Sequence, residues 1–115
     1  MKIENIKFKA KRLDGKWWAI GDLLHSYENG AIIVPIEGGG AFSVDHSTVC
    51  QFTGMKDKNG APIYEGDIVM HKDNNAERRG DINWDSKAAA FCFGQDFLVH
   101  YHSEDMVVVG NKFDK

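Results

Sequence analysis

The stretch that decides the fold is QFTGMKDKNGAPIYEGDIV, residues 51–69. Its charged residues belong either to a catalytic site or to a pair of turns. Asn59 and Gly60 stand between apolar flanks, a combination that favours a tight hairpin turn because both residues tolerate positive φ. Gly66 and Asp67 predict a second tight turn before the next apolar run. We therefore interpret Asn59, Gly60, Gly66 and Asp67 as structural turn residues.

The carboxylates of this stretch do not follow the spacing of a calcium-binding loop. Such a loop places its ligands as D-x-[DN]-x-[DN]-G and ends on a glutamate. Only Asp57 and Asn59 precede Gly60 in this way, and no glutamate stands at the final position. We therefore expect the change Asp57→Asn to leave stability and binding nearly unchanged.

Alternating and apolar segments predict strands along the rest of the chain. In residues 6–13, Ile6, Phe8 and Ala10 point to one side and the intervening lysines to the other, which is the period of a half-buried strand. Turn signals follow at Asp14-Gly15, Glu28-Asn29-Gly30 and the glycine run 38–40, and Pro35 places the third strand at an edge or a bulge. Further strands are predicted over residues 16–27, 31–36, 41–44, 48–54, 67–71, 80–84, 88–94, 96–102 and 106–111, with an exposed loop over 72–79.

Many short strands separated by turns are typical of an all-β barrel or sandwich. Turns built on Gly-Asp fit the strongly bent sheet of a small SH3-like barrel. We predict one all-β domain, in which residues 1–53 form an N-terminal β-hairpin or meander extension and residues 54–115 the barrel.

Composition limits the function classes. The chain has 115 residues, 43% of them hydrophobic, which suits one domain with a modest core. Its net charge of -3 argues against a protein that coats DNA, although residues 1–16 carry +4 and the remainder -7. Cys50 and Cys92 form no metal or disulfide pattern, and neither a signal peptide nor a membrane span is recognisable. We expect a cytoplasmic protein that does not contact membranes.

Three sequence groups could carry chemistry, and none has a complete motif. The run Asp45-His46-Ser47 has the composition of a hydrolytic triad, but adjacent residues rarely align for catalysis, so a cap or turn is expected. The glycines at 38–40 lack the lysine of a phosphate-binding loop. On a strand, His100 and His102 would share a face and could hold zinc or nickel with Glu104, Asp105 or His71; a solvated face is the favoured alternative. We expect no catalytic residue, cofactor or bound metal.

A basic strip at the N-terminus is the candidate binding surface. Lysines on one strand face beside aromatic residues are a known way to hold single-stranded nucleic acid. Lysines on an edge strand also keep that edge soluble and unpaired, and we favour this second interpretation. The candidate nucleic-acid-binding residues are Lys7, Lys9, Lys11, Arg12, Lys16 and Trp17.

A series of short motifs runs along nearly the whole chain, at residues 8–25, Thr48-Val49, 51–54, 56–60, 63–69, Ile82 with Trp84, and Val109-Gly110-Asn111. In these motifs the chain resembles the YopX family, which is encoded by phages and prophages of bacteria. The resemblance implies an SH3-type barrel with an N-terminal β extension, no established activity and no catalytic residue. This sequence departs from the family at Cys50, where a glycine is usual, and at its shorter C-terminal run NKFDK.

These observations together favour a non-enzymatic binding or assembly module in the bacterial cytoplasm. We expect it to act through protein–protein contacts, either with itself as a homo-oligomer or with a phage or host protein. A module that binds single-stranded nucleic acid through the basic strip is the alternative.

Overall fold

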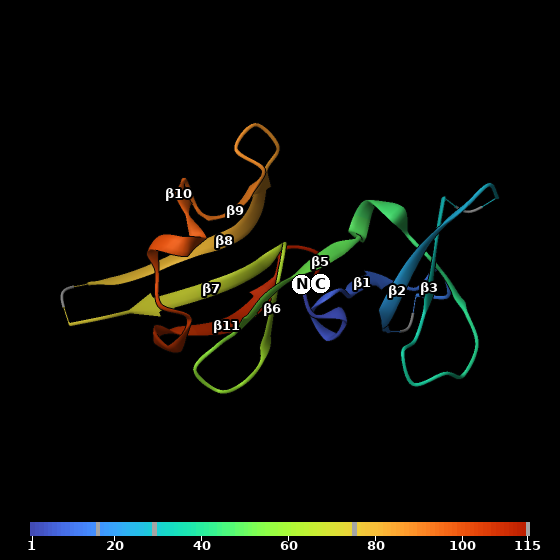
Figure 1. Ribbon diagram of the computed structural model, residues 1–115, viewed down its shortest axis with the longest axis horizontal. Helices are drawn as coiled ribbons and strands as arrows, with labels where there is room; N and C mark the ends of the chain where they lie inside the picture. Colours follow the sequence, from blue (N-terminus) through green and yellow to red (C-terminus); the bar gives the residue numbers. More distant parts are fainter. Residues whose placement is uncertain (16, 29, 75, 115) are drawn as a thin grey trace. The chain divides into compact units, whose positions relative to one another are not determined.

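The computed structural model describes residues 1–15, 17–28, 30–74 and 76–114. Strands and short 3-10 helices make up the secondary structure, and these ranges contain no α-helix (Figure 1). The predicted all-β class is therefore confirmed. The same ranges contain no helix long and apolar enough to span a membrane. The chain divides into two compact units, Met1–Phe52 and Thr53–Lys115.

The first unit is an antiparallel sheet in the order β4-β3-β2-β1, to which the start of β5 is added. Residues 14 and 15 turn the chain between β1 and β2, as expected from Asp14-Gly15, and Gly15 has a φ of 77°. In the turn predicted over 28–30, Asn29 lies outside the described residues. The elements of this unit are η1 (Ile3–Asn5), β1 (Phe8–Lys11), β2 (Trp18–Ser26), β3 (Gly30–Val34), β4 (Phe42–Val44), η2 (His46–Thr48) and the start of β5 (Cys50–Lys56).

The first sheet is strongly bent, so that the end of β1 meets β4, the strand at the other side of the sheet. Main-chain hydrogen bonds join the end of β1 to β4: the N–H of Leu13 donates to the carbonyl of Ser43 at 3.0 Å, and that of Asp45 to the carbonyl of Lys11 at 2.8 Å. Three alanines at the centre permit this close approach of strands, because they add little volume to the core. The buried core residues are Ala10, Ala19, Ala31, Ile33 and Val44.

The second unit holds the end of β5, its hairpin partner β6, and an antiparallel sheet in the order β10-β9-β8-β7-β11. Its other elements are β6 (Pro62–Tyr64), β7 (Asp67–Lys72), β8 (Glu77–Asp85), β9 (Ala90–Phe93), β10 (Asp96–Phe97), η3 (Leu98–His100), η4 (Ser103–Asp105) and β11 (Met106–Asn111). Its buried core is Ile63, Val69, Ile82, Phe93, Leu98 and Met106.

The strand order of the described residues gives two antiparallel sheets and defines no closed barrel. The SH3-like barrel therefore stays a prediction, whereas the all-β class does not depend on it.

Two predicted strand boundaries near glycine and proline are wrong. The strand predicted to end at Gly54 continues to Lys56, because the Thr53 hydroxyl accepts a hydrogen bond from the N–H of Met55 at 3.1 Å and supports the positive φ of Gly54. Pro35 lies just beyond the end of β3, which is an interior strand between β2 and β4.

Two predictions in the second unit are also wrong. The exposed loop predicted over 72–79 is much shorter, because Lys72 pairs with Glu77 and extends the hairpin of β7 and β8. The strand predicted over 96–102 is only the two residues of β10, followed by η3. Its apolar residues are consecutive and not alternating, so Leu98 enters the core while Val99 is exposed.

Candidate functional site

The turn after β5 is organised by the buried carboxylate of Asp57. Its Oδ1 accepts hydrogen bonds from the N–H groups of Asn59 and Ala61, and its Oδ2 from that of Val108, each at 2.9 Å. Burial raises the pKa of Asp57, but the three main-chain donors outweigh it, so the pKa lies below its ordinary value. Asn59 and Gly60 are exposed in this turn, and Gly60 has a φ of 82°. Three main-chain donors thus use the carboxylate for structure. These contacts lead us to expect a loss of stability from Asp57→Asn, in place of the neutral effect expected from the sequence.

The second turn is fixed by Asp67, which is fully buried. Its Oδ2 accepts a hydrogen bond from the N–H of Tyr64 at 2.8 Å, and its Oδ1 one from Nδ2 of Asn111 at 3.0 Å. Gly66 in the same turn has a φ of 89°, and its carbonyl accepts from the N–H of Lys112 at 2.9 Å. The turn therefore holds the C-terminal end of β11 in place.

The basic strip lies on one face of the first unit, over aromatic rings. The Nζ atoms of Lys9 and Lys11 lie 4.6 and 5.1 Å from the ring centroid of Trp18, and Nζ of Lys7 lies 4.6 Å from that of Phe52. These distances are those of cation–π contacts. The structure thus brings the three lysines of the strip together as a row.

The other members of the predicted strip are placed differently. Arg12 lies over the ring of Phe42 at 4.1 Å and pairs with Asp14. Trp17 is 72% exposed, and Trp18, not Trp17, lies beneath the lysines. Lys16 lies outside the described residues. The pairing of Lys11 with Trp18 across β1 and β2 explains the difference, since opposite residues share a face.

The remaining sequence candidates are structural where they are described. Asp45 caps η2, with its Oδ1 accepting from the N–H and hydroxyl of Ser47 at 3.0 and 2.7 Å. His100 ends η3 and its ring meets Phe97 edge-on, whereas Nδ1 of His102 lies 3.7 Å from Glu104. Within the described residues, no three His, Cys, Asp or Glu side chains gather as a metal site.

Both cysteines are buried within their separate units, and neither forms a disulfide bond. Burial raises the pKa of Cys92, with the carboxylates of Asp85 and Asp96 adding to it. A raised pKa keeps the thiol protonated and unreactive at neutral pH.

An apolar hollow in the second unit was missed from the sequence. It measures about 480 Å³ and is lined by side chains of β5, β9, β10, η3 and the turn before β9. The consecutive apolar residues 97–99 were the available signal, since an apolar run that does not alternate cannot bury all its members in a strand. The lining residues are Thr53, Met55, Ala88, Ala90, Phe91, Phe97, Leu98 and Val99.

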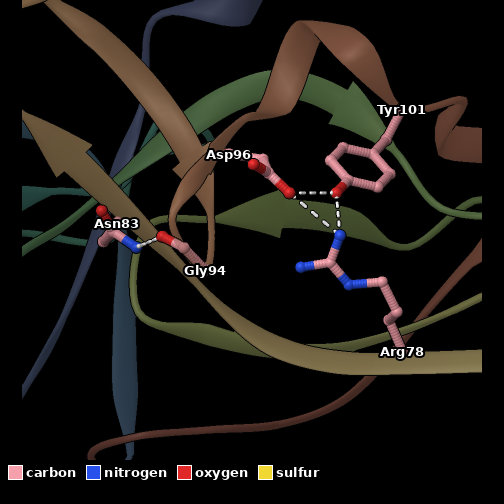
Figure 2. A network of polar contacts seen from close by, with 5 residues as sticks. All are labelled: Arg78, Asn83, Gly94, Asp96 and Tyr101. Atoms are coloured by element: carbon pink, nitrogen blue, oxygen red, sulfur yellow. Dashed lines mark hydrogen bonds and ion pairs between the residues drawn. The ribbon is translucent and has the colours of Figure 1, made fainter.

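A triangle of polar contacts holds the segment that forms one wall of this hollow (Figure 2). Oδ2 of Asp96 accepts from the hydroxyl of Tyr101 at 2.7 Å and from Nη1 of Arg78 at 2.9 Å, and Arg78 also donates to that hydroxyl. The hydrogen bonds from Tyr101 and Arg78 lower the pKa of Asp96, and the bond to Asp96 together with burial raises the pKa of Tyr101. Both groups are therefore held in their usual charge states at neutral pH.

The hydroxyl of Tyr101 belongs to the triangle, while its ring packs against the core. It meets the rings of His71 and Phe93 edge-on, each at a centroid distance of 5.0 Å. In Figure 2 a separate contact, from Nδ2 of Asn83 to the carbonyl of Gly94 at 2.9 Å, fixes the turn between β9 and β10. The triangle and this contact together anchor the start of β10 and the turn before it.

The chain thus offers two candidate surfaces, an apolar hollow and a lysine row. Buried polar side chains such as Asp57 and Asp67 instead form hydrogen bonds that hold turns and strands together. Neither a curated protein nor a solved structure matches the chain. The family model described as YopX protein matches residues 3–115, nearly the whole chain. The chain therefore belongs to the YopX family.

Proposed function

We propose that this protein is a non-enzymatic binding or assembly module, of phage or prophage origin, that works by protein–protein contacts in the bacterial cytoplasm. The observation that carries the proposal is the apolar hollow of the second unit. Phe97 and Val99 on its wall are exposed, and Val99 is 81% exposed. Apolar side chains gathered around a concave surface favour association, because covering them removes apolar area from water.

A second copy of the chain is the occupant that this surface fits. Val99 projects from the wall of the hollow, so one patch offers both an apolar knob and an apolar recess. A two-fold interface requires this property, since each copy presents the same patch to the other.

Strand addition is a less suitable mode for the second unit. The outer edge of β11 is occupied by the turn after β5, where Lys58 N–H donates to the Met106 carbonyl at 2.9 Å and Val108 N–H donates to Asp57. Pro62 in β6 removes one donor from that strand. The contact between this turn and β11 also supports our proposal of an SH3-like barrel, because it links the first and last strands of the unit.

Sedimentation velocity over a concentration series tests the proposal. We expect the wild type to self-associate and Val99→Asp to weaken that association at least tenfold, because a carboxylate would be buried in the apolar hollow. The matched control is Val109→Asp, which changes another exposed valine of the same unit outside the hollow.

Two results would contradict the self-association. One is a wild-type chain that stays monomeric at every concentration, and the other is an equal effect of both variants. Capture of a different protein by the wild type but not by Val99→Asp would replace the second copy as occupant.

Single-stranded nucleic acid at the lysine row is the second candidate. The observation that favours it is the row itself, with Lys7, Lys9 and Lys11 at alternate positions of one strand face. If this function is correct, log affinity falls against log salt with a slope of roughly -0.7 per phosphate contacted.

A further inference from the structure

An apolar hollow lies beside the lysine row, and nothing in the sequence indicated it. A hollow of about 380 Å³ opens beside it, lined by Lys7, Ile20, Pro35, Ile36 and Glu37. Ile20 is 47% exposed and Ile36 61% exposed. Ile20 lies opposite Lys9 in the pairing of β1 and β2, so it stands on the lysine face. This face is therefore both cationic and apolar.

The spacing of the row suits an extended chain. Lys7, Lys9 and Lys11 occupy alternate positions of an extended segment, which separates their neighbouring Cα atoms by about 6.5 Å. Alternate side chains of an extended peptide repeat at the same distance, so acidic residues at every second position could each face one lysine.

The aromatic rings under the row favour a peptide over a nucleic acid. Base stacking needs an open ring face, and here the ammonium groups of Lys9 and Lys11 lie over Trp18 and that of Lys7 over Phe52. The rings instead hold the lysines in place and reduce the conformational freedom lost on binding.

The net charge of the rest of the chain favours a short acidic partner over a long one. Residues 1–52 contain six Lys and Arg against six Asp and Glu, and residues 53–115 contain eight against eleven. The first unit is thus neutral as a whole and carries -3 outside Lys7, Lys9 and Lys11, and the rest of the chain also carries -3. A long polyanion would meet net repulsion beyond the row, whereas a short acidic segment would not.

We infer that the lysine face of the first unit binds a short, extended acidic segment of a partner protein, with an apolar side chain of that segment entering the hollow between Ile20 and Ile36. This surface is independent of the apolar hollow in the second unit. Charge complementarity supplies the orientation and the two isoleucines the apolar contact.

Fluorescence anisotropy with a labelled peptide of sequence Glu-Gly-Glu-Gly-Glu-Gly-Leu, in which the leucine shares a face with the glutamates, tests this inference on the full chain. We expect binding that is roughly tenfold weaker for the triple variant Lys7→Gln, Lys9→Gln and Lys11→Gln, since the ion pairs made by three half-buried lysines are lost. The matched control removes three exposed lysines of the second unit, Lys56→Gln, Lys58→Gln and Lys72→Gln, and should bind as the wild type does. Thermal unfolding checks that each variant is folded.

Two further probes separate the alternatives. A Glu-Gly-Glu-Gly-Glu-Gly-Ala peptide should bind several-fold more weakly, and the double variant Ile20→Ser and Ile36→Ser should remove that difference. Equal affinity of the two peptides for the wild type would overturn the apolar part of the inference. Absence of binding to the leucine peptide, or tighter binding of labelled oligothymidylate than of that peptide, would overturn it entirely.

Discussion

At the scale of single residues, one carboxylate organises the central turn. Asp57 joins three N–H groups, and the donor of one of them, Val108, lies 51 residues further along the chain. An aspartate that organises its own turn is a local pattern, but the bond to Val108 exists only because β11 passes beside that turn. The same side chain thus sets both a turn and the position of a strand.

Replacing Asp57 by Asn should lower the free energy of unfolding by about 1–3 kcal/mol. The amide oxygen can still accept from Asn59 and Ala61, but the amide nitrogen then faces the N–H of Val108 and leaves it unsatisfied. Urea unfolding measures the change, and Asp73→Asn in the exposed turn after β7 is the control. An unfolding midpoint equal to that of the wild type would show that the bond to Val108 contributes nothing.

The lowered pKa of Asp57 predicts the direction of a pH effect. A carboxyl whose pKa is lower in the folded state stabilises the protein above its unfolded pKa, about 3.9, and this contribution is lost as pH falls through the folded pKa. Unfolding free energies measured from pH 7 downward should therefore fall less steeply for Asp57→Asn than for the wild type. Parallel curves would refute this assignment.

Substitutions at Gly60 test the effect of backbone conformation alone, without steric clashes of the new side chain. A Cβ at this position would meet nothing within 4 Å, but the φ of 82° is strained for a β-branched residue. Gly60→Val should cost on the order of 1–3 kcal/mol of stability, and Gly60→Asn much less because asparagine tolerates this region. Chemical denaturation compares the two, and equal losses would mean that φ is not the cause.

At the scale of elements, β10 and η3 form a short strap whose attachment is both polar and apolar. Leu98 is buried in the core, while the triangle of Arg78, Asp96 and Tyr101 holds the strap from the outside. The strap also supplies Phe97 and Val99 to the apolar hollow. The shape of that hollow therefore depends on the triangle.

Removing the hydroxyl in Tyr101→Phe should loosen this strap without unfolding the unit. The ring can still pack on His71 and Phe93, but both hydrogen bonds of the triangle that involve the hydroxyl are lost. Amide hydrogen exchange should become faster at Tyr101, whose N–H bonds the carbonyl of Leu98 at 3.0 Å, and stay unchanged in β7. Tyr27→Phe, at a fully exposed position, is the control. Uniform acceleration across the second unit would instead indicate global destabilisation.

At the scale of the whole molecule, the two units have separate cores and separate candidate surfaces. The first offers the lysine face and the second the apolar hollow. If both proposals hold, the chain engages two partners of different chemistry, one charged and one apolar. The salt dependence of each interaction distinguishes them, since only the charged one is strongly screened.

Elemental analysis of the purified chain should find well under one zinc or nickel ion per molecule. A metal site needs three or four converging ligands, and His100 and His102 lie on and after η3, not side by side on one strand. Treatment with a chelator should leave the thermal unfolding midpoint unchanged. A stoichiometric metal lost in the double variant His100→Ala and His102→Ala would prove this expectation wrong.

The sequence by itself determined the features that depend on neighbouring residues. Alternation over residues 6–13 placed Ala10 in the core and the lysines on the other face, and the turns at Gly15 and Gly60 followed from residues that permit positive φ. The family also followed from short motifs read in order. Only the tertiary structure decided how distant segments meet: Asp57 with Val108, Asp67 with Asn111, the lysines with Trp18, and the walls of the apolar hollow. The physical reason is that periodicity and turn chemistry act within a few residues, whereas strand order and core packing select which faces and edges are brought together.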